Sequence, residues 1–454
     1  MKKTSFTYGL LCLLLNSACV EPFDVGPELV ESSSLAGMLI VEANITNEEK
    51  NQYVYLTRMQ QVESDSTVNV EENTLFNPFT PFLVENGLAP QFESNAEISI
   101  RDDIGTIYLF NETEPGTYES EIQFAAIPNR NYQLFITTND NTSFQSEEVS
   151  VPNASSIASI YAERILNETG QEGMGIFVDS SIPSNSDGFL RFSYEETYKI
   201  IAPNWTPSEF EVIREQQVPV IDPLTGDLIE TLYPDVRTVP RMRAEQVCYK
   251  TDPSTEIILS NLDNLSNSVL TRNRVRFLDR NNPIIAHRYS ILVKQFVTSR
   301  EAFTFYQNLN SFSSSDNLFS QIQPGPLEGN IKNSNGNAPV LGLFEVTTET
   351  SQRLYFNFAD FFPNEPLPPY FGDGFNCDRL LSPPLQNPER DGPPSPDSAC
   401  PQPLIERIQL GLVEYVDVNP NPGICEGPYF VTPTLCGDCT IVGSNSIPEF
   451  WIEE

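Results

Sequence analysis

Few residues in this chain have the types and spacing that catalysis requires. The 454 residues include a single histidine, His287. One histidine excludes the two-histidine HExxH zinc motif, and no GxSxG turn is present to supply an activated serine. The sequence also lacks the GxxxxGK[ST] loop that cradles phosphates. These patterns disfavour the common zinc, serine and phosphate chemistries.

Carboxylates are the remaining candidates for chemistry. With 62 acidic residues, adjacent pairs such as Glu195 and Glu196 arise by chance, although a glycoside hydrolase does use two carboxyl groups. Residues 417–423 resemble the first five positions of a calcium loop, but the glycine comes one place late and Pro428 stands where glutamate is required. We therefore expect no catalytic residue, no metal and no cofactor. A carboxylate-dependent glycoside hydrolase remains the less favoured alternative.

The cysteines predict cross-links. Cys436 and Cys439 form a single CxxC, which lacks both the βαβ setting of a redox pair and the second half of a zinc site. In an oxidising compartment an even number of cysteines indicates disulfides, and six cysteines allow fifteen pairings. The candidates are Cys248, Cys377, Cys400, Cys425, Cys436 and Cys439.

The N-terminus predicts export and lipidation. Lys2 and Lys3 precede a short apolar run at residues 6–15, and small residues then lead to Cys19. This order is typical of a secretory signal, and the apolar run is too short to span a bilayer. We predict a signal peptide at 1–18 and a tether at 19–34 with Cys19 acylated, for example by palmitate. Asn16 departs from the usual lipobox, in which that place is aliphatic, so an ordinary signal peptide with an incidental cysteine is the alternative.

Charge and periodicity set the class of the exported body. A net charge of −36 repels nucleic acid, so no nucleic-acid partner is expected. Short alternating stretches such as 39–45, 53–57, 96–100 and 132–136 predict strands, with turn residues between them. We predict a mainly β protein with two or more sandwich-like domains. The first, at 35–152, would be of the immunoglobulin or transthyretin kind.

The rest of the body is predicted in two parts. Residues 153–357 form a mixed, β-rich domain with one short helix, which begins after Ser299 and buries Phe303, Tyr306 and Leu309 along one face. Residues 358–454 form a proline-rich part held by disulfides.

The order of several segments resembles a Bacteroidota lipoprotein family known as domain-of-unknown-function family 4249. The matching segments are residues 19–24, 39–46, 96–103, 115–118, 289–291 to 305–306, 329–331 with 340–344, and the tail 436–439 that ends near 448–451. The resemblance covers nearly the whole chain. It implies a surface or periplasmic lipoprotein that is often encoded beside a TonB-dependent outer-membrane receptor, and it supplies no catalytic residues.

We therefore expect a non-enzymatic, surface-exposed outer-membrane lipoprotein that is an accessory or binding subunit of a TonB-dependent receptor-type barrel. The alternative partner is an outer-membrane assembly or secretion machine. Two insertions, at 60–92 and 202–247, are candidate docking surfaces because aromatic residues are enriched in interfaces. Their aromatic residues are Phe76, Phe79, Phe82, Phe92, Trp205 and Phe210, which can equally cover neighbouring strands. Ser66 and Ser398 lie in tripeptides that resemble the short O-glycosylation signal of Bacteroidota.

Overall fold

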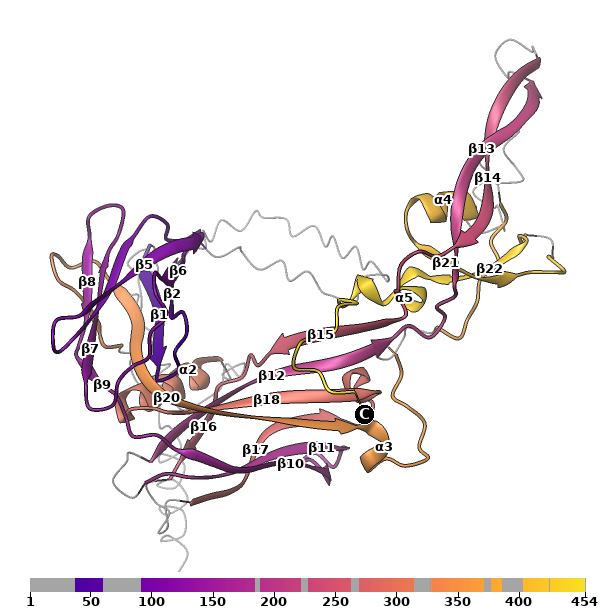
Figure 1. The fold of residues 1–454 in the computed structure, drawn as a ribbon. Helices are drawn as coiled ribbons and strands as arrows, with labels where there is room; N and C mark the ends of the chain where they lie inside the picture. The colour runs from indigo at the N-terminus through magenta and orange to yellow at the C-terminus, as the bar shows by residue number, and fades with distance from the viewer. Residues whose placement is uncertain are drawn as a thin grey trace, which may run out of the picture.

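The computed structural model describes residues 37–59, 91–183, 188–221, 228–262, 269–313, 327, 329–370, 377–385, 403–423 and 425–453. The protein is mainly β, as the alternating patterns predict, with few helices. Figure 1 shows an N-terminal sandwich, a second sandwich and a C-terminal part beside which a long hairpin projects.

The N-terminal sandwich is a strongly curved sheet wrapped around one apolar core. Its order is β1-β2-β6-β5-β4-β7-β8-β19, and β3 and β9 pair with β2 and β7. Inward residues of β1 alternate as predicted: Leu39, Val41, Ala43 and Ile45 are buried. The strands are β1 (Leu39–Thr46), β2 (Tyr53–Arg58), β3 (Gln91–Phe92), β4 (Glu97–Asp102), β5 (Ile107–Glu114), β6 (Thr117–Ser120), β7 (Asn131–Thr137), β8 (Ser143–Ser146), β9 (Val149–Ser150) and β19 (Ile331–Asn333).

One strand belongs to both sandwiches. The first eight residues of β20 (Val340–Asn357) pair in parallel with β1, and the following residues pair antiparallel with β18. A Cβ on Gly342 would lie 2.3 Å from the carbonyl oxygen of Val41, and a Cβ on Gly329 would lie 1.7 Å from that of Gly342. Glycine is required at both positions because backbones meet there. The predicted regions 35–152 and 153–357 are therefore joined through β20 (Figure 1).

The second sandwich packs two sheets face to face. The larger contains β15 (Val247–Pro253), β12 (Phe189–Ile201), β18 (Arg288–Val297), the end of β20 and β16 (Ile258–Asn261). The smaller contains β10 (Ser156–Leu166), β11 (Glu172–Ser181) and β17 (Val269–Asp279). Their inner faces share one core cluster. Arg276 of β17 bonds both carboxylate oxygens of Glu196 on β12, which ties the two sheets together.

The predicted helix is present as α2 (Arg300–Ser313). Ser299 Oγ accepts a hydrogen bond of 3.1 Å from the Ala302 amide, which is the expected N-terminal cap. The helix is pinned to β20 by Glu345, a buried carboxylate that accepts hydrogen bonds from Tyr306 and Arg191 at 3.1 Å each. Phe303 is buried against Phe189, and Tyr306 and Leu309 pack against a core cluster, so the predicted stripe faces the protein interior.

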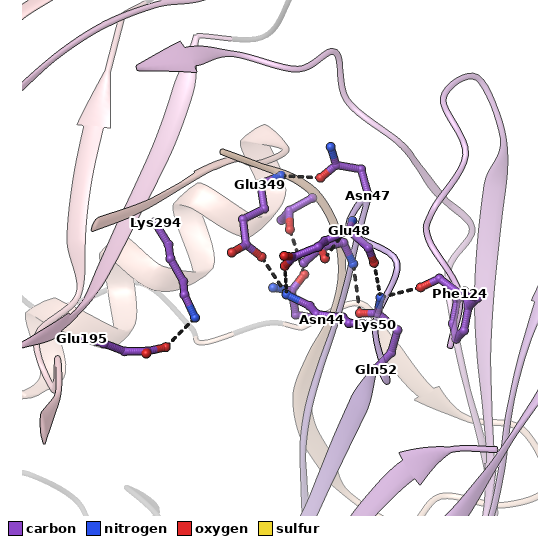
Figure 2. Close-up of polar contacts among 11 residues, drawn as sticks. Asn44, Asn47, Glu48, Lys50, Gln52, Phe124, Glu195, Lys294 and Glu349 are labelled. Atoms are coloured by element: carbon purple, nitrogen blue, oxygen red, sulfur yellow. Dashed lines mark hydrogen bonds and ion pairs between the residues drawn. The ribbon is translucent and has the colours of Figure 1, made fainter. Parts of the chain in front are cut away.

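A polar network fixes the junction between the sandwiches (Figure 2). Lys50, after the end of β1, lies 2.8 Å from the carboxylates of both Glu48 and Glu349. Burial opposes its charge, but hydrogen bonds to Glu349 and Glu48 outweigh it and raise the pKa of Lys50. Asn47 Oδ1 accepts a hydrogen bond of 2.6 Å from the Glu349 amide. The β1–β2 turn is thereby attached to the point where β20 passes into the second sandwich.

The C-terminal part contains a small two-stranded sheet and short helices. Its elements are α3 (Phe358–Phe361), α4 (Leu404–Gln409), β21 (Val413–Val418), β22 (Tyr429–Pro433), α5 (Thr434–Gly437) and the 3-10 turn η3 (Cys439–Ile441). Trp451 near the chain end is buried against Tyr249 and Tyr355, so the tail packs on the second sandwich.

Candidate interaction site

The insertion at 202–247 forms a long antiparallel hairpin. Strands β13 (Ser208–Ile221) and β14 (Leu228–Pro240) pair from Ser208 and Pro240 to Ile221 and Leu228, with a register shift after Ile213. Figure 1 shows the hairpin projecting away from the two sandwiches, with the C-terminal elements around its base. We call this hairpin the arm. A two-stranded ribbon alone is only marginally stable in water, so its base needs support.

Aromatic packing supplies part of that support. Phe210 on β13 contacts the rings of Tyr415 and Tyr429 edge to face, with 5.4 Å between centroids in each case. Phe210 and Tyr429 also pack against a small core cluster of the C-terminal part, formed by Leu404, Val413 and Val431. Phe210, predicted as a partner-binding residue, therefore packs within its own chain.

An ion cluster supplies the rest. The Arg241 side chain, 2% exposed, bonds the carboxylates of Glu245 and Glu414, the latter at 2.7 Å. Burial raises the pKa of Glu414, and the Arg241 charge opposes this effect. Because Arg241 directly follows β14 and Glu414 lies on β21, the cluster fixes the base of the arm to the C-terminal part.

Two disulfides hold the C-terminal part in place. Cys248 on β15 bonds Cys439, and Cys377 bonds Cys436. The CxxC cysteines therefore pair with distant residues and not with each other, which confirms a structural role for them. Cys425 is also disulfide-bonded, and Cys400 lies outside the described residues.

Trp205 lies at the start of the arm, half-buried beside the Cys248–Cys439 bridge. The neighbouring Asn204 amide donates to the carbonyl oxygen of Cys436 at 2.9 Å. Trp205, a second predicted partner-binding residue, thus covers the bridge.

The N-terminal sandwich carries exposed apolar residues on its outward face. Tyr53 and Tyr55 project from β2, and Ile107 and Leu109 from β5. Strand β6 lies between these two strands, and its Glu119 and Thr117 stand opposite Tyr53 and Tyr55. The first two rings stack with centroids 6.3 Å apart.

Phe92 is half exposed on β3 at the edge of the same face, opposite Thr57. Of the predicted partner-binding residues that the structure describes, Phe92 is the one whose side chain is exposed to solvent. Phe76, Phe79 and Phe82 lie outside the described residues, as do Cys19, Ser66 and Ser398.

In the structure, residues of the carboxylate pair and of the calcium-like segment make hydrogen bonds and ion pairs within the protein. Glu195 binds Lys294, whereas its neighbour Glu196 binds Arg276 and Tyr289 in the core of the second sandwich. Adjacent residues of a strand point to opposite faces, so these carboxylates do not form a pair across one substrate. In the calcium-like segment, Asn419 Oδ1 accepts from the Asn421 amide, and no cluster of three metal-ligating side chains occurs in the described ranges.

Sequence reasoning missed the ion cluster at the base of the arm. Arg241 and Glu245 are four residues apart, a spacing that suggests a helical pair, but the helical backbone is absent there. Glu414 is 173 residues from Arg241 in the sequence. No local pattern links them, because the cluster depends on how the C-terminal part folds back.

Comparison with known proteins gives a family but no described activity. No described helix is long and apolar enough to cross a membrane. No curated protein matches the chain. A family model described as "Domain of unknown function (DUF4249)" matches residues 24–353, which include the N-terminal sandwich, the arm and the second sandwich except the end of β20. The chain therefore belongs to the DUF4249 family.

Proposed function

We propose that this protein is a Bacteroidota outer-membrane lipoprotein, anchored on the cell surface through Cys19, that binds a β-barrel receptor of the TonB-dependent type as an accessory subunit. The arm is the observation that carries the proposal. It stands away from the body, and its base is fixed by Phe210, by Arg241 and by a C-terminal part that two disulfides hold.

A fixed base matters for binding because a pre-positioned element loses less conformational entropy when it docks. A projecting ribbon also offers unpaired strand edges, which can add to the strand of a partner. The exposed rings of Tyr53, Tyr55 and Phe92 form a second candidate contact on the N-terminal sandwich. Both surfaces suit contact with a protein partner.

The test shortens the arm without disturbing its base. Residues 213–235 are replaced by Asn-Gly, so that Val212 and Val236, which are paired in the native hairpin, flank a two-residue turn. The full-length lipoprotein, affinity-tagged in its native host, is extracted gently and the captured barrel is identified by mass spectrometry. We expect the shortened protein to lose the barrel while its membrane attachment and thermal unfolding stay unchanged.

A matched variant, Tyr55→Ser with Leu109→Ser, changes the sandwich face instead. Retention of the barrel by the arm-shortened protein, with loss from the face variant, would move the docking site to the sandwich. Capture of an assembly or secretion machine would replace the receptor as partner, and capture of no barrel by the unaltered protein would overturn the proposal.

A further inference from the structure

A cavity of about 180 Å³ lies where the second sandwich meets the C-terminal part. Its walls come from the end of β12, from the 3-10 turn η2 (Pro283–Ile285) before β18, and from Tyr370 and Val442. An adjoining hollow of about 280 Å³ shares four of its lining residues, among them Lys199 and His287. The two form one composite pocket.

The cavity is lined mainly by apolar and aromatic side chains. Ile200, Ile284 and Val442 contribute aliphatic groups, and Tyr198 and Tyr370 contribute rings. The Tyr198 hydroxyl is already used, because it donates to Asp252 at 2.8 Å. A dry apolar cavity of roughly 150 Å³ binds benzene, so this one has room for a single ring or a branched alkyl group of similar size.

The hollow has a different character. Among its described lining residues, Lys199 and Arg288 are basic and Glu453 is acidic. Glu453 places both carboxylate oxygens 3.1 and 3.2 Å from Lys199 Nζ, so the hollow already accommodates a carboxylate, supplied by the chain's own tail.

His287 lies where the two volumes meet. Burial and the nearby Lys199 charge lower its pKa, so the imidazole is neutral at pH 7 and offers one donor and one acceptor. A neutral ring at this boundary can contact an apolar group on one side and a polar head on the other.

From this geometry we propose that the composite pocket binds a small carboxylate that carries one apolar ring or a branched alkyl group of like size. The apolar group enters the cavity beside Ile284 and Tyr370. The carboxylate points into the hollow towards Lys199, where it displaces the carboxylate of Glu453. This proposal does not depend on the arm or on a barrel partner.

The sole histidine makes the test direct, because histidine labelled with ¹³C gives a single imidazole signal from the pocket. The probe is 3-phenylpropionate, titrated into the full-length mature protein and followed by NMR and calorimetry. We expect a saturable shift of the His287 signal. 3-Phenylpropanol lacks the charge and propionate lacks the ring, so the affinity for each should be lower than that for 3-phenylpropionate by a factor of about ten or more.

Two variants locate the site. Lys199→Gln should weaken 3-phenylpropionate binding by about tenfold, and Ile284→Trp should abolish it by filling the cavity. The control is Lys332→Gln, which removes an exposed lysine paired with Glu147 on the N-terminal sandwich and should bind normally. No saturable shift in the unaltered protein, equal binding of propionate, or undiminished binding in a folded Ile284→Trp variant would each overturn the proposal.

Discussion

The Arg241 guanidinium bonds two carboxylates, that of Glu245, which follows the arm in the chain, and that of Glu414 on β21. Glu245 is 4% exposed and Glu414 is 19% exposed, and both bond the same side chain. A buried ion cluster adds little stability compared with apolar packing, but removal of one partner leaves charge in a place where water cannot compensate it. The cluster therefore fixes the geometry of the attachment more than it adds to the overall free energy of folding.

Arg241→Met should lower the free energy of unfolding by about 3 to 5 kcal/mol, because Glu245 and Glu414 lose their shared counter-charge. Urea unfolding at neutral pH measures the change. Arg237→Gln is the matched control, since Arg237 on the same arm pairs with Glu211 at the surface and such exposed pairs contribute about 0 to 1 kcal/mol. Equal effects of the two substitutions would contradict a buried role for Arg241.

At the scale of elements, the sequence predicts what depends on local pattern. The alternation of Leu39, Val41 and Ala43 identifies β1, and Ser299 with the following aromatic residues identifies α2. The sequence does not predict that β20 pairs with β1, because 301 residues separate Leu39 from its partner Val340. Disulfide connectivity is equally non-local, and for this reason the spacing of Cys436 and Cys439 leaves it open.

The candidate site was predicted only in outline. The 202–247 insertion is recognisable as a long interruption, but its folding into an arm depends on support from Tyr415, Tyr429 and Glu414 of the distant C-terminal part. The aromatic residues Trp205 and Phe210 looked like contact residues because they occur in an insertion. In the structure Phe210 packs on that support, and Trp205 packs beside the Cys248–Cys439 bridge.

The two bridges should differ in strength because they close loops of different length. Cys248 and Cys439 are 191 residues apart, and Cys377 and Cys436 are 59 apart. Replacing either pair by serine should cost about 2 to 5 kcal/mol, and loop entropy makes the longer bridge worth about 1 kcal/mol more. Urea unfolding of the two double variants measures the difference. A greater loss from the Cys377 and Cys436 pair would show that loop entropy does not set the order.

At the scale of the whole molecule, the proposed anchor and the arm lie in different parts of the chain. The anchor is at Cys19, ahead of β1, whereas the arm follows β12 of the second sandwich. The two sandwiches between them are joined by β20 and by the Lys50 network (Figure 2). A docked partner and the membrane would therefore hold the protein at two separate places.

If Cys19 is acylated as proposed, Cys19→Ala should move the protein from the membrane to the soluble fraction, because the acyl chains would supply the apolar surface that enters the bilayer. The arm-shortened background is used so that a barrel partner does not retain the protein. Cys12→Ala, in the apolar run of the predicted signal, is the matched control and should stay in the membrane. Fractionation and palmitate labelling measure both, and a Cys19→Ala protein that still sediments with membranes would exclude the lipid anchor.

The shared strand β20 has a mechanical consequence. In the proposed arrangement, a pull on the tether that is resisted by a partner at the arm would load β1 along its length. Its eight residues pair in register from Leu39 with Val340 to Thr46 with Thr347. Load along a strand is carried by all of these hydrogen bonds in shear at once, whereas load across a strand edge opens them one at a time. Because β20 continues directly into the second sandwich, tension passes from tether to arm through continuous β-structure.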